Sequence, residues 1–155
     1  MKKLLLVGAI VLGSIGFSTN VLAAINEQQA KDIVKKEAPN GQITKFKLDK
    51  ENGKKVYEIE VMDGNIEKDY EIDAETGAIL KMEQEQKGNK KNNSVDNPKI
   101  SSDKAKEIAL KQSKNGKFKE IELKHKNGVL VYDVEIAEGF MDREFLIDAN
   151  TGEIL

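Results

Sequence analysis

Apolar and polar residues alternate along several stretches of the chain, most clearly over 45–48, 56–61 and 70–74. A period of two is typical of strands that bury one face and expose the other. Over 30–34 and 105–109 the apolar residues instead follow the i, i+3, i+4 spacing of a short amphipathic helix. The pattern therefore predicts short helices, each followed by antiparallel strands that are covered on one side.

Each predicted helix has a recognisable start. Asn26 precedes the first helix and Gln29 follows three residues later, which completes a capping-box pattern. In the second helix either Ser101 or Ser102 serves as the cap. The Asn-Gly pairs at 40–41 and 115–116 tolerate a positive φ, so we expect them to end the helices.

The chain repeats itself with an offset of 75 residues. Laying 25–80 on 100–155 without a gap gives 21 identities in 56 positions, and the sequence Ile-Asp-Ala-x-Thr-Gly-x-Ile-Leu closes both segments. We therefore predict an α+β fold of two tandem modules, 25–80 and 100–155, each a short helix packed on one face of a small antiparallel β-sheet. The segment between them, 81–99, is rich in Lys, Asn, Gln and Glu and is predicted to be a polar linker.

Hairpin turns are expected at 63–64 and 138–139. A two-residue turn at Asp63-Gly64 places Tyr57 opposite Tyr70 on the inner face, and the same register in the second repeat places Tyr132 opposite Phe145.

The first 23 residues have the layout of a secretory signal peptide. Two lysines precede an uncharged apolar run over 4–17, and small residues at 21 and 23 favour cleavage after Ala23. The alternative is an uncleaved membrane anchor, for which a run of this length is short. We therefore expect a secreted or extracytoplasmic protein, in the cell envelope or the extracellular space, with no membrane span after cleavage.

The composition excludes several kinds of catalytic and metal-binding site. There is no cysteine and no tryptophan, and His125 is the one histidine, so disulfides, thiol nucleophiles and zinc centres are excluded. The 25 basic and 27 acidic residues give a formal net charge of −2, which argues against nucleic-acid binding through phosphates. His125 lies between two lysines and its counterpart in the first repeat is Lys50, so we interpret it as a solvated turn residue. We predict no catalytic residue, cofactor or metal centre of these kinds, and no enzyme activity.

The segments that agree best between the two repeats are interpreted as turns. They contain Asp73, Thr76 and Gly77 in the first repeat and Asp148, Thr151 and Gly152 in the second. Asp and Thr side chains bind nearby backbone groups, and Gly permits a positive φ. Neither segment has the ligand spacing of a calcium loop.

The outer face of each predicted hairpin is acidic. The expected register pairs carboxylates across the strands, which forms a candidate acidic face for cations or a basic partner. Its residues are Glu58 opposite Asp69 and Glu60 opposite Glu67 in the first repeat, with Asp133 opposite Glu144 and Glu135 opposite Asp142 in the second.

The second repeat also carries apolar residues on this outer face. The candidate partner-binding residues are Val129, Val131, Phe140 and Leu146. Three of them replace the polar Lys54, Asn65 and Glu71 of the first repeat, and Val131 is expected directly opposite Leu146. An apolar cluster on a polar face indicates a contact, with the first repeat, a second molecule or a target protein.

These repeats resemble the PepSY family. The resemblance rests on the Ala-x-x-Ile-Val/Ala helix stripes, the Val-Tyr strands at 56–61 and 131–136, and the Ile-Asp-Ala-x-Thr-Gly turns ending at 80 and 155. It implies small α+β modules of the kind found in metalloprotease propeptides and exported bacterial proteins, which are proposed to restrain or bind peptidases. It implies no catalytic residue.

Two functions are expected in consequence. The first is a non-catalytic exported protein-binding module that binds or inhibits a secreted or envelope peptidase. The alternative is an envelope structural or cation-binding protein that uses its acidic sheet faces.

Overall fold

The computed structural model describes residues 24–87 and 97–155. Within them the chain forms an α+β fold of two helices and seven antiparallel strands, as the hydrophobic pattern predicts. In chain order these are α1 (Glu27–Glu37), β1 (Gln42–Glu51), β2 (Lys54–Asp63), β3 (Ile66–Asp73), β4 (Ile79–Gln86), α2 (Ser102–Lys111), β5 (Lys117–Lys126), β6 (Val129–Glu138) and β7 (Met141–Asp148). The predicted signal peptide, 1–23, lies outside the described residues. Neither described helix has the length and apolar character needed to cross a membrane.

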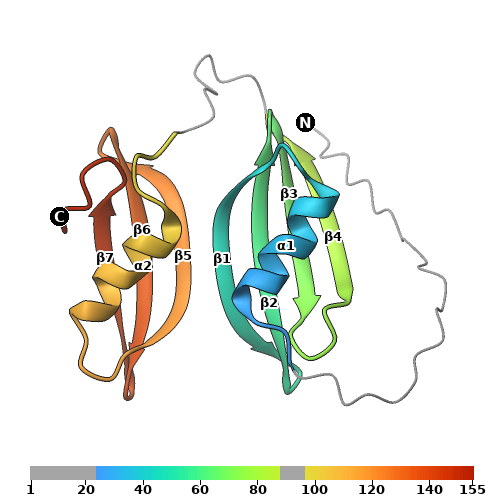
Figure 1. The fold of residues 1–155 in the computed structure, drawn as a ribbon, viewed down its shortest axis with the longest axis horizontal. Coiled ribbons are helices and arrows are strands. Elements are labelled where there is room, and N and C mark those ends of the chain that lie inside the picture. The colour runs from blue at the N-terminus through green and yellow to red at the C-terminus, as the bar shows by residue number, and fades with distance from the viewer. Residues whose placement is uncertain (1–23, 88–96) are drawn as a thin grey trace, which may run out of the picture.

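All seven strands belong to one sheet, in the order β4-β3-β2-β1-β5-β6-β7 (Figure 1). We call α1 with β1–β4 the first module and α2 with β5–β7 the second module. The repeat pattern predicts a small sheet for each module, whereas the structure joins the two through the antiparallel pair β1–β5. The two modules therefore share a continuous backbone ladder.

The junction has approximate two-fold symmetry. Phe46 of β1 pairs with Ile121 of β5, and these two residues occupy equivalent positions 75 apart in the repeats. On either side Lys45 pairs with Glu122 and Lys47 with Glu120. Because the two equivalent strands run antiparallel about this point, equivalent ends of the two modules point in opposite directions.

Both helices cover the same face of the sheet (Figure 1), and ion pairs link their side chains across the junction. Lys31 of α1 is only 7% exposed, and its Nζ lies 2.8 Å from Glu27 Oε1 and 3.0 Å from Asp103 Oδ1 of α2. Lys106 of α2 reaches back to Glu27. A buried lysine held by carboxylates from both helices fixes the modules relative to each other, since leaving such a charge unpaired is costly.

The helix starts are confirmed. Asn26 and Gln29 form both bonds of the capping box, at 2.9 Å each, and Ser101 rather than Ser102 caps α2. The expected helix stops are wrong: Asn-Gly at 40–41 and 115–116 has no positive φ. Glycine is needed at 41 and 116 because neither position has room for a side chain. A Cβ at 41 would lie closer than 3.0 Å to the Val61 side chain, and a Cβ at 116 equally close to that of Ile136.

The predicted hairpin register is shifted by two residues. Asp63 pairs with Ile66, so the turn is Gly64-Asn65, and Tyr57 pairs with Ile72 rather than Tyr70. In the second module Tyr132 likewise pairs with Ile147 instead of Phe145. A shift of two keeps every side chain on its predicted face, which is why the core was predicted correctly although its cross-strand pairs were not.

The linker begins later than predicted. Residues 81–86 continue β4, which pairs with β3 from Ile72 to Ile66, so they belong to the first module. Their polar composition is typical of a linker, but they form part of a strand at the edge of the sheet. Of residues 81–86, Met82 is the one that packs on the core. Most of the remaining predicted linker, 88–96, lies outside the described residues.

Candidate functional site

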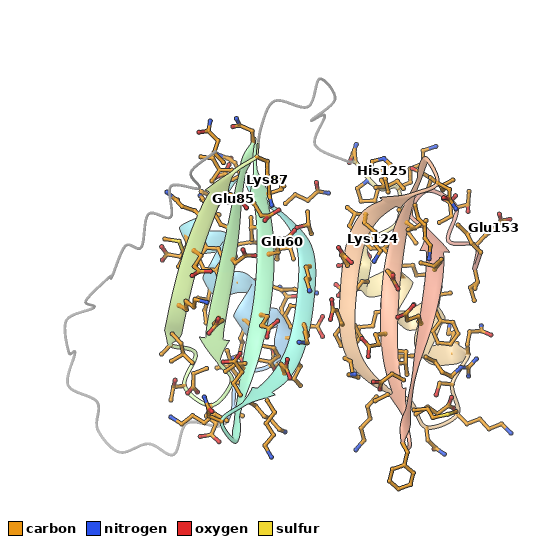
Figure 2. All side chains as sticks on the ribbon, turned by 180° about the vertical axis from the view of Figure 1, so that it is seen from behind. Glu60, Glu85, Lys87, Lys124, His125 and Glu153 are labelled. Carbon is orange, nitrogen blue, oxygen red and sulfur yellow. The ribbon has the colours of Figure 1, made fainter. Side chains whose placement is uncertain are left out.

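The sheet face opposite the helices has no covering element among the described residues; we call it the open face (Figure 2). Its side chains are mostly charged, and lysines pair with carboxylates on neighbouring strands: Lys45 with Glu120 (3.0 Å), Lys47 with Glu58 (3.6 Å), Lys81 with Glu71 (3.2 Å) and Lys124 with Asp133 (2.8 Å). The predicted acidic face is thus a mixed face in which most of the negative charge is compensated.

Because the register differs from the predicted one, the acidic residues of the open face have other cross-strand partners than expected. Glu58 lies opposite Glu71 and Glu60 opposite Asp69, so the first module keeps two acid–acid pairs with new partners. In the second module Glu135 lies opposite Glu144, whereas Asp133 lies opposite Leu146 and Asp142 opposite Ala137. The predicted pairings Glu58–Asp69, Glu60–Glu67, Asp133–Glu144 and Glu135–Asp142 are therefore wrong.

Three of these carboxylates converge in the first module. Single oxygens of Glu60, Glu67 and Asp69 all lie within 4.8 Å of one another. Ca²⁺ binds carboxylate oxygens at about 2.3–2.6 Å, so two ligands of one ion can be about 5 Å apart. We call these three residues the acidic triad, and its spacing fits a hard divalent cation.

The acidic triad lies beside a shallow pocket on the open face. The pocket is lined chiefly by Lys45, Glu58, Glu60, Asp69, Glu71 and Glu83. Burial raises the pKa of the Glu60 carboxyl above its usual range, and the neighbouring Glu67 and Asp69 raise it further. Burial and Glu67 likewise raise the pKa of Asp69. For both groups burial and the neighbouring acids outweigh the favourable contacts, which are the Thr44 hydrogen bond for Glu60 and the charges of Lys87 and Lys45 for Asp69.

Nearby polar groups compensate the acidic triad only in part. The Thr44 hydroxyl donates to Glu60 Oε1 at 2.5 Å. Lys87, at the end of β4, lies 2.6 Å from Glu67 Oε1 and 3.3 Å from Glu85 Oε2. Figure 2 shows Lys87, Glu85 and Glu60 near the same end of the first module.

The second module has an ammonium group at the equivalent place. Thr44 and Lys119 are equivalent residues, and each lies where the ladder between the first two strands of its module shifts register. Lys119 pairs with Glu135 and, at 2.6 Å, with Asp142, which are the counterparts of Glu60 and Glu67. Lys119 lowers the pKa of Asp142 below its usual range. The carboxylates are thus held by a lysine in one module and by a threonine hydroxyl in the other.

The four apolar candidates do not form one patch. Val131 is 0% exposed, so its predicted exposure is wrong, and it pairs with Asp148 rather than Leu146. Val129 (37% exposed) begins β6, whereas Phe140 (109% exposed) follows its end. At about 3.3 Å per residue, the nine steps along β6 place these two about 30 Å apart. Leu146 is half-buried.

The Asp-x-x-Thr-Gly segments are turns, as predicted. Asp73 Oδ1 accepts from the backbone N–H of Glu75 (2.8 Å) and Thr76 (2.9 Å), and Gly77 has φ +75°. Asp148 does the same in the second module, with bonds of 2.7 and 2.9 Å. His125 lies in the β5–β6 ladder opposite Leu130, next to the Asn127-Gly128 turn, where it was expected.

Comparison with known proteins agrees with this geometry. The family model described as "Peptidase propeptide and YPEB domain" (PepSY) matches residues 24–83 and 99–155. The chain belongs to the PepSY family. The uncharacterized protein YkoJ of Bacillus subtilis (strain 168) is 30% identical over 172 residues, covering all of this chain and 96% of YkoJ. The crystal structure of a putative lipoprotein (CD1622) from Clostridium difficile 630 is 27% identical, covers 88% of this chain and 93% of its own, and has a TM-score of 0.56.

The family model covers both modules. It assigns no function to any single residue of this chain. The features that distinguish the two modules are the acidic triad in the first and the exposed apolar residues Phe140 and Met141 in the second.

Proposed function

We propose that this chain is a non-catalytic exported protein that binds or inhibits a secreted or envelope peptidase. The family match carries the proposal, because the family is described by its presence in peptidase propeptides and the match covers both modules. The similarity to a lipoprotein and the expected signal peptide support export. A seven-stranded sheet with one face left open by the helices offers the broad surface that such a partner needs.

The proposal is tested with the protein starting at residue 24 as bait for the exported proteins of its own source. We expect it to retain a peptidase and to lower that enzyme's activity. Reversing one charge on the open face, Glu58→Lys, should weaken binding at least about tenfold, since charge complementarity governs such contacts. Asp32→Lys makes the same change in charge on the helix side and serves as the control. Failure to bind or inhibit any exported peptidase would refute the proposal.

A second candidate, cation binding on the open face, is favoured by one observation: the acidic triad has no lysine at the place that Lys119 occupies in the second module. Glu60, Glu67 and Asp69 would supply three oxygens to a Ca²⁺-like ion, and water the others. In this candidate the ion takes over in the first module the role of the Lys119 ammonium in the second.

The repeat supplies matched variants for this candidate. Thr44→Lys should weaken calcium binding, measured by calorimetry, at least about tenfold, because the new ammonium competes for the same oxygens. Lys119→Thr should create a second site at Glu135 and Asp142. Gln28→Lys adds the same charge on α1 and should change nothing. A flat titration of the unaltered protein, or one that Thr44→Lys leaves the same, would exclude this candidate.

A further inference from the structure

Two large apolar side chains project from the turn between β6 and β7. Phe140 is 109% exposed and Met141 72% exposed, and Gly139 before them has φ +68°. Most of the large hydrophobic residues that are well exposed in the described chain lie in the second module. Exposed aromatic and sulfur-containing side chains at a turn contribute nothing to the core, so the fold alone does not explain them.

The charged residues that flank this turn form ion pairs, Glu138 with Arg143 and Asp142 with Lys119, and two further lysines lie near it. Lys114 and Lys117 lie at the same end of the second module, since Lys117 pairs with Ala137 near the end of β6. Both side chains are exposed, and neither forms an ion pair with the residues described at 24–87 and 97–155. We call Lys114, Lys117, Phe140 and Met141 the basic apolar tip.

The first repeat has no equivalent of the basic apolar tip. Its residues at the equivalent positions are Pro39, Gln42, Asn65 and Ile66. Ile66 is half-buried and pairs with Gln86 of β4. All four changes occur at one end of one module, and together they add two ammonium groups and two exposed apolar side chains there.

The described chain also starts at this end of the molecule. Ile25 N–H donates to Ala74 O (2.8 Å) and Ala74 N–H to Lys55 O (3.0 Å), which ties residue 25 to the first-module end that holds the β1–β2 turn. Because β1 and β5 are antiparallel, that end lies on the same side of the sheet as the basic apolar tip (Figure 1). Lys54 and Lys55 are exposed on this side as well.

We propose that the basic apolar tip docks the protein on an anionic phospholipid bilayer. Phe140 and Met141 enter the boundary between headgroups and acyl chains, while Lys114 and Lys117 lie against the phosphates. Charge complementarity points to such a membrane, because lysines without ion-pair partners beside apolar side chains match a bilayer whose headgroups are negative and whose acyl chains are apolar. This role is independent of the peptidase proposal, since it uses the end of the sheet and not the open face.

Fluorescence tests the proposal, because the chain has no tryptophan. Phe140→Trp, in the protein starting at residue 24, introduces a single reporter at the tip. With phosphatidylglycerol/phosphatidylcholine vesicles its emission should shift to the blue, and with phosphatidylcholine alone it should not. Asn65→Trp places the same reporter at the equivalent turn at the opposite end and should show no shift. Equal shifts for both reporters, or no shift for Phe140→Trp, would overturn the proposal.

Vesicle sedimentation gives the second measurement. Phe140→Asn, the residue of the first repeat, should lower the affinity for anionic vesicles about tenfold, and Lys114→Gln and Lys117→Gln about fivefold each. Lys35→Gln and Lys36→Gln, in the last turn of α1 at the opposite end, are the controls and should have no effect. Binding that survives Phe140→Asn, or that the control changes weaken equally, would contradict docking by this tip.

Discussion

Replacing Phe46 by alanine is expected to lower the free energy of unfolding by about 3–5 kcal/mol. Phe46 is 1% exposed at the junction of the two modules. Its ring centroid lies 5.3 Å from that of Tyr57 in its own module and 6.2 Å from that of Phe118 in the other. The Lys31 ammonium lies 5.2 Å above the ring. The alanine would leave a cavity shared by both modules and remove a contact of the buried lysine.

The measurement is urea unfolding of the protein starting at residue 24, followed by circular dichroism and by amide signals from β4 and β7. We expect one transition for both strands, displaced to lower urea in the variant, because the sheet and the helix ion pairs join the modules. Phe46→Leu keeps most of the volume and should cost less than about 1.5 kcal/mol. A variant in which the β4 signals alone are displaced would show that the modules unfold separately.

The sequence predicted the elements and the buried faces because both depend on local patterns. Alternation and helical spacing identify which side chains point inward, and the repeat confirms each assignment a second time. Ala30, Val34, Ala105 and Ala109, all predicted for the inner helix faces, are 0–1% exposed. The turn register failed because Asp63-Gly64 and Gly64-Asn65 are both acceptable two-residue turns, and a shift between them moves no residue to the wrong face.

The junction was missed because the pairing of two edge strands leaves no periodic signal in either one. A charge signal was nevertheless present. Lys45 and Lys47 of the first repeat correspond to Glu120 and Glu122 of the second, so two equivalent strands carry opposite charges on the same face. Antiparallel pairing of these strands brings Lys45 opposite Glu122 and Lys47 opposite Glu120, as observed.

The acidic triad was predicted in part. Glu60, Glu67 and Asp69 were placed on the correct face by alternation, but their convergence depends on the two-residue shift and on the irregularity at Thr44. An irregularity of this kind redirects a side chain without any change in the hydrophobic pattern. Aligning the repeats pairs Thr44 with Lys119, and that single difference would have indicated which module lacks a lysine between its carboxylates.

A glycine follows each helix at a point where the second strand of its module approaches closely. Gly41→Ala should lower the free energy of unfolding by about 1–3 kcal/mol, because the added methyl group would overlap Val61 in a region packed without voids. Gly41 does not have a positive φ, so the cost comes from this overlap and not from backbone strain.

A double-mutant cycle isolates that overlap. Val61→Ala removes the methyl group that the new Cβ would meet, so the double variant Gly41→Ala/Val61→Ala should be more stable than the sum of the single effects by about 0.5–3 kcal/mol. The repeat supplies the control: Gly116→Ala meets Ile136 instead, so combining it with Val61→Ala should give additive effects. Urea unfolding of the five variants measures both couplings. Additive effects in the Gly41 cycle would mean that the glycine is needed for a reason other than the close approach of β2. Equal coupling energies in both cycles would mean that Val61→Ala alters packing throughout the sheet and not only at Gly41.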